Sequence, residues 1–496
     1  MGLIAHEPVL VTDPPDDDRK YLYTYVGQRL LGGRERINYY DLSRTRPALV
    51  VGTTGSGKSE LMASMATMDN QKGRCTIFID GKCDINLMQK LYYYTRHGHK
   101  SGPQRAFYCL IPHPEYDTLT HSWNPLFLTT VEPSTISETV FNSYSPPESE
   151  GRGEGSFYSS YQRQAFSLIC AALLKSGKVA SFQDVVRLLT HPEIMDTMAG
   201  MITQEGMTAF RKLVLMRREQ PREFNDRLRG FVNFLMKFSH HSLNSYNPAI
   251  QLDRLVFTDS FIYVGLPLNL EPHLMRALGN IFINQLKSLT HRLQSSNRLR
   301  RSISCYIDEA GSFIDSGAVD WINKVRSTGL MLTLSIQLLA DLQGRRPGFS
   351  EQVPGNTPNV YFFQTRDPAT ATWFSELSGR QLGQSQTASV KAVEGELTET
   401  GAGSARLDER PRISRDLGYN LRKGQMYFLP ESSIRPMLLA GAYMPEPSDD
   451  PRRRYVRRSL IAKSRSVAYS LTTSSARTRE VTPLSSKRPE VKKTPG

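Results

Sequence analysis

The residues at 52–59 constrain the fold more than any other part of the chain. They read Gly-Thr-Thr-Gly-Ser-Gly-Lys-Ser, which fits the phosphate-loop pattern Gly-x-x-x-x-Gly-Lys-Ser/Thr. The apolar run at 47–51 predicts a buried strand before the loop, and apolar residues recur at helical spacing from Leu61 to Met68 after it. We therefore expect a loop between a strand and a helix N-terminus, rather than an ordinary glycine-rich turn.

The residue types of this loop suit a nucleotide. Glycines allow the backbone to curl so that successive N–H groups point at an anion, and the helix dipole adds positive charge at the same end. Lys58 would reach the β- and γ-phosphates, and the Ser59 hydroxyl would ligate Mg²⁺. The expected cofactors are ATP and Mg²⁺, with the nucleotide held by Gly52, Thr53, Thr54, Gly55, Ser56, Gly57, Lys58 and Ser59.

Strand-like and helix-like segments alternate on both sides of a purely helical stretch. Such alternation indicates an α/β domain with a mainly parallel sheet and helices on both faces. Between Pro133 and Asn247 only helical periodicity is found, which indicates an inserted all-α domain. Strands are expected at 47–51, 75–80, 106–110, 261–264, 303–307, 330–336, 360–364 and 425–429.

These patterns divide the chain into four parts. They are an N-terminal extension at 1–46, a nucleotide-binding domain at 47–132 and 251–445, an all-α insertion at 133–250, and a tail at 446–496. Residues 21–25 are interpreted as an edge strand, 143–156 as an exposed linker, and the polar, glycine-rich stretch 378–412 as a mobile loop. The composition of the tail, rich in Pro, Ser, Arg and Lys, predicts disorder.

Charge is concentrated in the tail. Residues 451–496 hold thirteen Lys or Arg and two acidic residues, a net charge of +11 that leaves only +3 of the chain's +14 for the rest. The five cysteines are odd in number and lack Cys-x-x-Cys pairs, so a reducing cytosol is expected in place of zinc sites or disulfides. We find no signal-peptide pattern and no run of 18 apolar residues, so a soluble, cytoplasmic chain is expected.

A second group of candidate residues lies far along the chain. The strand-like run at 302–307 ends in Asp308 and Glu309, which are either two solvated carboxylates or functional groups. In the functional interpretation Asp308 holds Mg²⁺ through water, and Glu309 is the general base that polarises the attacking water. Gln337, at the end of the next strand, either caps that strand or senses the γ-phosphate. Arg326 is either surface charge or an arginine finger that reaches a neighbouring subunit.

The order of motifs resembles the type IV coupling proteins of conjugative DNA transfer, the TraG/TraD type, which belong with the hexameric FtsK/HerA group of DNA pumps. The similarity covers about residues 45–440. In chain order its motifs are the phosphate loop, Asp80-Gly81-Lys82-Cys83-Asp84, Trp123-Asn124-Pro125-Leu126, Asp308-Glu309, Arg326-x-x-Gly329, Gln337, Asn356-Thr357-Pro358-Asn359, Asp367-Pro368-Ala369-Thr370-Ala371 and Leu377-Ser378-Gly379.

The resemblance implies a RecA-like P-loop ATPase that couples ATP hydrolysis to the movement of DNA through a ring. Only this similarity implies that the ring is a hexamer. Implied partners are DNA, a relaxase or relaxosome, and components of a type IV secretion system. Two departures stand out: Cys83 occupies a position where the family usually has Gly, and the transmembrane helices typical of the family are not found. We therefore expect a partner to recruit this chain to the inner face of the membrane.

Three alternatives remain open at this point. Instead of a DNA-coupling protein, the chain could be a soluble FtsK/HerA-like pump, a coupling ATPase that recruits protein effectors without DNA, or an assembly scaffold that uses nucleotide only as a switch. The Asp308-Glu309 pair argues against the scaffold, because a protein without turnover has no need of a general base.

Overall fold

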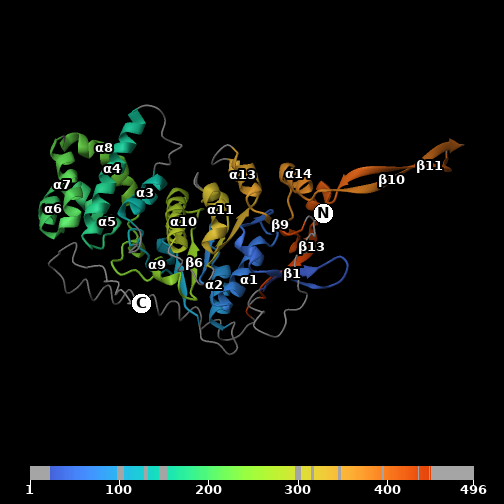
Figure 1. The fold of residues 1–496 in the computed structure, drawn as a ribbon, viewed down its shortest axis with the longest axis horizontal. Coiled ribbons are helices and arrows are strands. Elements are labelled where there is room, and N and C mark those ends of the chain that lie inside the picture. The colour runs from blue at the N-terminus through green and yellow to red at the C-terminus, as the bar shows by residue number, and fades with distance from the viewer. Residues whose placement is uncertain are drawn as a thin grey trace. The chain divides into compact units, whose positions relative to one another are not determined.

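The fold is described from a computed structural model of the chain (Figure 1). It describes residues 23–97, 105–127, 132–144, 154–219, 221–295, 303–313, 318–343, 348–393, 396–433, 435–445 and 447. Contacts divide the chain into two compact units. The first comprises the described residues of Met1–Leu61 and Ser335–Ala442, and the second those of Met62–Leu334 and Tyr443–Gly496.

The strands of the first unit form a mixed arrangement. Their order is β2 (Arg36–Tyr40), β1 (Tyr23–Arg29), β13 (Met437–Gly441), β12 (Gln425–Leu429), β9 (Asn359–Phe363) and β3 (Ala48–Val51). β3 and β9 are parallel, whereas the other neighbours pair antiparallel. The edge strand expected at 21–25 is corrected: β1 lies between β2 and β13, and β2 is the outer strand. The sequence pattern missed β2 and β13, neither of which is buried along its whole length.

Aromatic packing and short helices complete the core of this unit. The rings of Tyr361 and Phe428 stack with centroids 4.6 Å apart, and those of Phe362 and Phe374 at 4.0 Å. The four helices described here are α12 (Ala340–Gln343), α13 (Phe349–Gly355), α14 (Pro368–Leu377) and α15 (Arg415–Tyr419).

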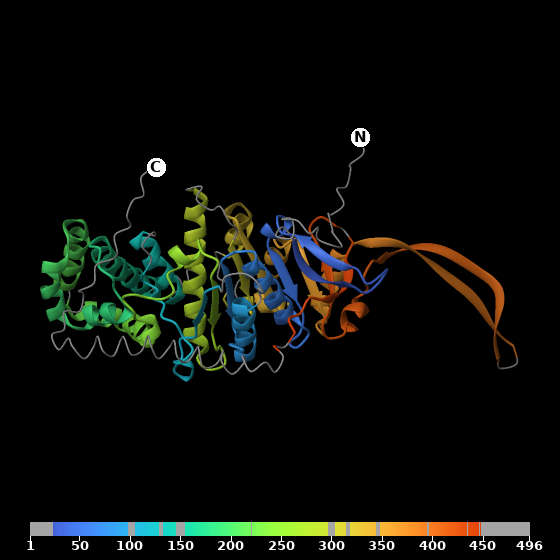
Figure 2. The same ribbon diagram turned by 90° about the horizontal axis from the view of Figure 1, so that it is seen from below.

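A long hairpin replaces the mobile loop expected at 378–412. β10 (Arg380–Val393) and β11 (Glu396–Pro411) pair antiparallel from Arg380↔Pro411 to Val393↔Glu396, so that expectation is wrong. Among the described strands these two pair only with each other, and they extend away from the other strands of the first unit (Figure 2). Backbone pairing between the two strands defines this ribbon, and its sequence shows little of the apolar alternation by which a strand is recognised.

The second unit contains an all-parallel arrangement of strands. Their order is β8 (Leu330–Ile336, of which residues 330–334 belong to this unit), β7 (Ile303–Ile307), β4 (Thr76–Asp80), β6 (Phe261–Gly265) and β5 (Phe107–Leu110). Every residue of β4, β6 and β7 is buried, as is typical of parallel strands covered by helices on both faces. The accompanying helices are α1 (Lys58–Gln71), α2 (Ile85–His97), α10 (Pro272–Ser295) and α11 (Ala318–Val325).

The helical stretch belongs to the second unit and packs through α3 on α10. It contains α3 (Pro133–Tyr144), α4 (Glu154–Lys175), α5 (Phe182–Thr190), α6 (Pro192–Met198), α7 (Gln204–Glu219) and α8 (Pro221–Met236), and α9 (Leu252–Leu255) follows. No β-strand occurs among the described residues of 132–247, as the helical periodicity predicts. Phe166 and Phe231 are fully buried between helices, with ring centroids 5.1 Å apart.

Two expectations concern residues that the structure does not describe. Most of the linker expected at 143–156 and, apart from Pro447, the whole tail at 446–496 lie outside the described residues.

Of the helices that are described, none has the length and apolar character required to cross a membrane. All five cysteines are buried and free.

Candidate functional site

The phosphate loop lies between β3 and α1, as its sequence predicts. Its backbone is held by neighbouring segments of the first unit. The Thr53 N–H donates to the Gln364 carbonyl at 2.8 Å, and the Gly424 N–H donates to the Ser56 carbonyl at 2.8 Å. The loop is therefore anchored at both ends by the chain that follows β9 and the chain that precedes β12.

Two of the loop glycines are required by close packing. A Cβ atom at Gly52 would lie 2.6 Å from Phe363 Cβ, and one at Gly57 would lie 3.3 Å from Gly424 Cα. Gly57 also has φ of 115°, a conformation that side chains disfavour. Gly55 differs, because it has φ of 81° but no atom within 4 Å of the position of its missing Cβ. Its requirement for glycine comes from the backbone alone.

Lys58 is buried at the start of α1, with an exposed fraction of 4%. Its ammonium donates to the carbonyls of Gly52 and, at 3.1 Å, Thr53. The ammonium group is thus held against the loop itself. In phosphate loops, the lysine at this position binds the phosphates of the nucleotide. Ser59, the next residue of α1, is partly buried.

Gln337, one residue after β8, contacts the phosphate loop. The Thr54 hydroxyl donates to Gln337 Oε1 at 3.1 Å. The backbone N–H of Gln337 also donates to Asp341 Oδ2 at 2.8 Å, which helps to form the turn after β8. The structure therefore places Gln337 both at a strand end and beside the loop, and its role as a sensor of the γ-phosphate stays a prediction.

In the second unit, Asp80 organises the turn at the end of β4. Its exposed fraction is 1%, and its carboxylate accepts hydrogen bonds of 2.8 Å from the N–H groups of Lys82 and Asp84 and from the Tyr263 hydroxyl. Burial and the nearby charge of Asp308 raise the pKa of Asp80, although the three donors act in the opposite direction. Asp80 was not predicted as a site residue, but its motif marked the turn that it holds.

Asp308 and Glu309 follow β7, the strand next to β4. Asp308 is buried with an exposed fraction of 1%, and its Oδ1 accepts the Glu309 N–H at 3.0 Å. Glu309 adopts a left-handed backbone conformation, with φ of 55° and ψ of 42°. Its carboxylate Oε1 lies 2.8 Å from Lys82 Nζ. The expected acidic pair therefore stands at a strand end together with a lysine from the neighbouring turn.

Lys82 is a residue that the sequence prediction missed. Burial is the largest single influence on its pKa and lowers it, but the carboxylates of Asp308, Glu309 and Asp80 together raise the pKa above its usual value. One cation thus faces three carboxyl groups, an arrangement that favours binding of a further cation. The Asp-x-Lys spacing after a predicted strand is the sequence signal that could have identified this residue.

Cys83 takes the backbone conformation that a glycine would take at that position. Its φ is 55°, and it shares positive φ with Glu309 alone among the described non-glycine residues. The turn after β4 therefore keeps a left-handed residue where the family usually has Gly.

Arg326 lies in a 3₁₀ turn, Arg326–Thr328, between α11 and β8. Its side chain lies outside the part of the structure that is described. Its suggested role toward a neighbouring subunit therefore stays a prediction.

Comparison with known proteins identifies a family for part of the chain. Residues 302–417 match the family described as the TraM recognition site of TraD and TraG. No curated protein sequence matches the chain. The matched residues include Asp308, Glu309, Arg326, Gln337 and the β10–β11 hairpin.

Solved structures share the fold over most of the chain. The unbound conjugative coupling protein TrwB aligns with a TM-score of 0.55 and 14% identity, covering 85% of this chain and 91% of that one. TrwB with an ATP analogue aligns with a TM-score of 0.53 and 14% identity, covering 86% and 97%. VirB4 of Thermoanaerobacter pseudethanolicus gives a TM-score of 0.50 at 15% identity, covering 85% and 96%. These matches confirm the RecA-like P-loop fold and the resemblance to the type IV coupling protein family.

Proposed function

We propose that this chain is an ATP-driven coupling protein that delivers DNA, as a relaxosome, to a type IV secretion or conjugation apparatus. The observation that carries the proposal is the turn pair after β4 and β7. It holds Asp80, Lys82, Asp308 and Glu309 together in a fold that otherwise matches conjugative coupling proteins. A scaffold without turnover would not need a paired glutamate beside a buried aspartate.

The residues present fit ATP and Mg²⁺. The loop glycines admit no side chain at 52, Lys58 is buried beside the loop carbonyls, and Asp308 adds a buried carboxylate for a hard cation. The solved TrwB structures include complexes with an ATP analogue and with ADP and Mg²⁺. Bound Mg-ATP would supply a γ-phosphoryl group open to attack by water.

Each protein group has a role in this scheme. Lys58 would neutralise charge on the β- and γ-phosphates, while Ser59 and Asp308 would hold the metal, the latter through water. Glu309 would accept a proton from the attacking water, and Gln337 would report the γ-phosphate through its contact with Thr54. Arg326 would act on the nucleotide of a neighbouring subunit in a ring, which we take to be a hexamer.

The proposed partners follow from the same family. The matched segment is described in TraD and TraG as a recognition site for TraM, so a relaxosome protein is the expected partner of residues 302–417. A DNA strand and components of the secretion apparatus complete the set. We place the protein on the cytoplasmic side of the membrane, recruited there by a partner.

DNA-dependent ATP hydrolysis tests this function. We expect single- or double-stranded DNA to stimulate phosphate release by the full chain, and Lys58→Ala to abolish both basal and stimulated release. Hydrolysis without any response to DNA would favour the coupler of protein effectors. Nucleotide binding with negligible turnover would favour the scaffold, whereas DNA stimulation without binding of relaxosome proteins would favour a soluble FtsK/HerA-like pump.

A mixing experiment tests Arg326 separately. Inactive Arg326→Ala and inactive Lys58→Ala subunits, combined in one ring, would create some interfaces with an intact loop and an intact arginine. We expect partial recovery of hydrolysis, since arginine fingers contribute on the order of 10³-fold to turnover. Confirmed mixed rings without recovery at any ratio would assign Arg326 to the surface or to structure.

A further inference from the structure

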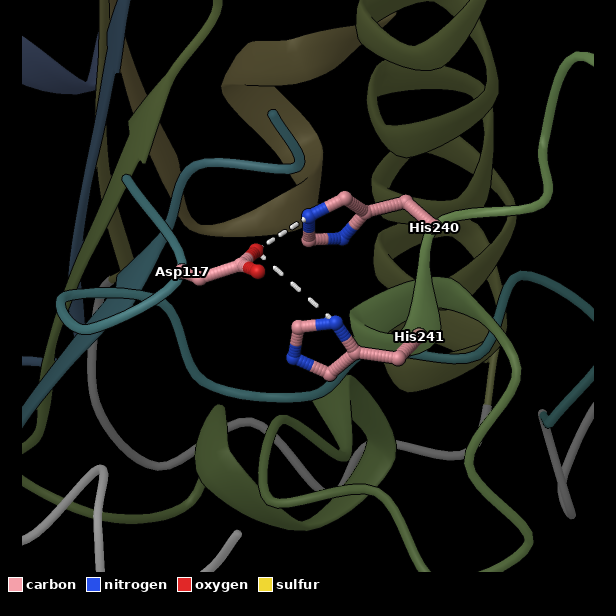
Figure 3. A group of neighbouring side chains, drawn as sticks. All are labelled: Asp117, His240 and His241. Carbon is pink, nitrogen blue, oxygen red and sulfur yellow. Dashed lines mark hydrogen bonds and ion pairs between the residues drawn. The ribbon is translucent and has the colours of Figure 1, made fainter. Parts of the chain in front are cut away.

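Asp117, His240 and His241 form a cluster in the second unit, where the chain enters and leaves the helical stretch (Figure 3). Asp117 follows the 3₁₀ turn Pro114–Tyr116, which comes after β5. The two histidines follow α8 at the start of the 3₁₀ turn His241–Leu243. Asp117 and His240 are 123 residues apart in the sequence, yet their side chains are in contact.

The atoms of the three side chains that could bind a metal lie close together. His240 Nε2 lies 2.7 Å from Asp117 Oδ1, and His241 Nδ1 lies 3.8 Å from the same oxygen. All three ligand atoms lie within 4.8 Å of one another. The contact of 3.8 Å is too long for a hydrogen bond. It is close to the separation of about 3.3 Å between two ligands that share one tetrahedral zinc ion.

Ser242 can orient the His240 ring in both states of the cluster. His240 Nδ1 lies 2.8 Å from Ser242 Oγ, a hydroxyl of a residue with an exposed fraction of 1%. Nδ1 accepts the Ser242 backbone N–H at 3.3 Å, which leaves Nε2–H to donate to Asp117 Oδ1 at 2.7 Å. When Nε2 binds an ion, Nδ1–H can donate to the Ser242 hydroxyl instead, which is the usual support of a metal-bound histidine.

The cluster is open to solvent on one side. The side chains of Asp117 and His241 are about half exposed, at 50% and 57%, whereas that of His240 is 9% exposed. An ion can therefore reach the site and complete its coordination with water. All five cysteines are buried, so no thiol among them offers an accessible competing site.

We propose that Asp117, His240 and His241 bind one divalent transition-metal ion of the zinc type. Two imidazoles and one carboxylate suit Zn²⁺, Ni²⁺ or Cu²⁺ better than Mg²⁺ or Ca²⁺, which prefer oxygen ligands alone. Backbone hydrogen bonds already join the segment that enters the helical stretch to the segment that leaves it. Trp123 N–H donates to the Ser242 carbonyl at 2.7 Å, and Ile250 N–H donates to the Ser122 carbonyl at 2.9 Å. The ion adds a side-chain clamp at the same place.

Titration calorimetry with Zn²⁺ alone tests the site on the full chain, without a polyhistidine tag and after removal of chelator. We expect one ion per chain. His241→Ala and Asp117→Asn should each weaken binding by about tenfold or more, the latter because an amide is a poorer ligand than a carboxylate. Binding also raises the melting temperature of the wild type, because the ion favours the folded state.

His191→Ala is the matched control, because it removes another exposed histidine that is paired with a carboxylate, Glu193, at 3.1 Å. This variant should bind Zn²⁺ like the wild type. Co²⁺ supplies a second readout, since its visible absorption should report nitrogen and oxygen ligands in the wild type and change in His241→Ala. If His241→Ala fails to fold, His241→Gln replaces it.

Absence of Zn²⁺ binding by the wild type at micromolar ion would overturn the proposal. Equal binding by the wild type, His241→Ala and Asp117→Asn would also overturn it, because the ion would then be adventitious. Neither result bears on ATP hydrolysis, so this inference and the proposed function fail independently.

Discussion

The phosphate loop and the paired turns after β4 and β7 adopt unusual backbone conformations by different means. In the loop the residues with positive φ are glycines, at 52, 55 and 57. In the paired turns Cys83 and Glu309 have φ of 55° although both carry side chains. A left-handed conformation costs a residue with a Cβ roughly 1–2 kcal/mol, whereas glycine adopts it freely.

The paired turns must therefore obtain their shape from tertiary contacts. Asp80 accepts the N–H groups of residues 82 and 84 and so fixes the turn around Cys83. Glu309 is held by its ion pair with Lys82, and its Cβ lies 3.0 Å from where a Cβ at Gly81 would stand. A motif rich in glycine announces its conformation in the sequence, whereas a conformation imposed by contacts does not.

Glu309→Gln tests the paired turns with the largest expected effect. It removes the proposed base and keeps the size of the side chain. We expect turnover to fall by roughly 10²- to 10⁴-fold while ATP affinity stays unchanged. Rapid-quench hydrolysis and binding of a fluorescent ATP analogue measure the two quantities, and wild-type turnover would refute the role of Glu309.

Gly52→Ala tests the steric requirement in the loop. Its Cβ would meet Phe363 Cβ at 2.6 Å, so the backbone or the aromatic residue must move. We expect a loss of about 2–3 kcal/mol in the free energy of unfolding, as for overpacked cores. Gly55→Ala is the control, because its Cβ meets nothing within 4 Å and the expected loss is about 1 kcal/mol. Equal losses in urea titrations would contradict this distinction.

Lys82→Met asks whether the lysine positions Glu309. We expect kcat to fall about tenfold with little change in KM, because the carboxylate loses its partner but the phosphate loop is untouched. Lys82→Arg keeps the charge and should restore most of kcat. A Lys82→Met enzyme with wild-type kcat would show that the ion pair is irrelevant to turnover, and a large increase in KM would assign Lys82 to binding.

Cys83→Gly and Cys83→Ala together measure the smallest effect. Both remove the buried thiol, but only glycine relieves the left-handed strain. We expect Cys83→Gly to be more stable to urea than Cys83→Ala by about 1 kcal/mol. No difference between the two variants would mean that the turn relaxes when the thiol is removed.

Much of the fold followed from the sequence where burial and chemistry agree. The apolar runs at 303–307 and 330–336 match β7 and β8, because strands buried on both faces read as continuous hydrophobic segments. The phosphate loop and the strand-end position of Asp308 were predicted for the same reason. Their patterns are local in the chain, and a single sequence displays them fully.

Features that depend on distant segments could not be predicted. Lys82 and Glu309 are more than two hundred residues apart, and their ion pair exists only because β4 and β7 are neighbours. The β10–β11 hairpin was mistaken for a loop because its pairing leaves no periodic trace. The contact between Asp117 and His240 likewise depends on how the chain returns after the six α-helices, α3 to α8, that the structure describes between them.

Because the chain enters and leaves the helical stretch at adjacent positions, we expect this stretch to behave as an exchangeable module. Its incoming and outgoing ends lie within one hydrogen bond of each other, between Trp123 N–H and the Ser242 carbonyl. A module whose two ends meet can be exchanged, lengthened or shortened without altering the span that the host must bridge. The strands that carry Asp80 and Asp308 can therefore stay unchanged while the module diversifies.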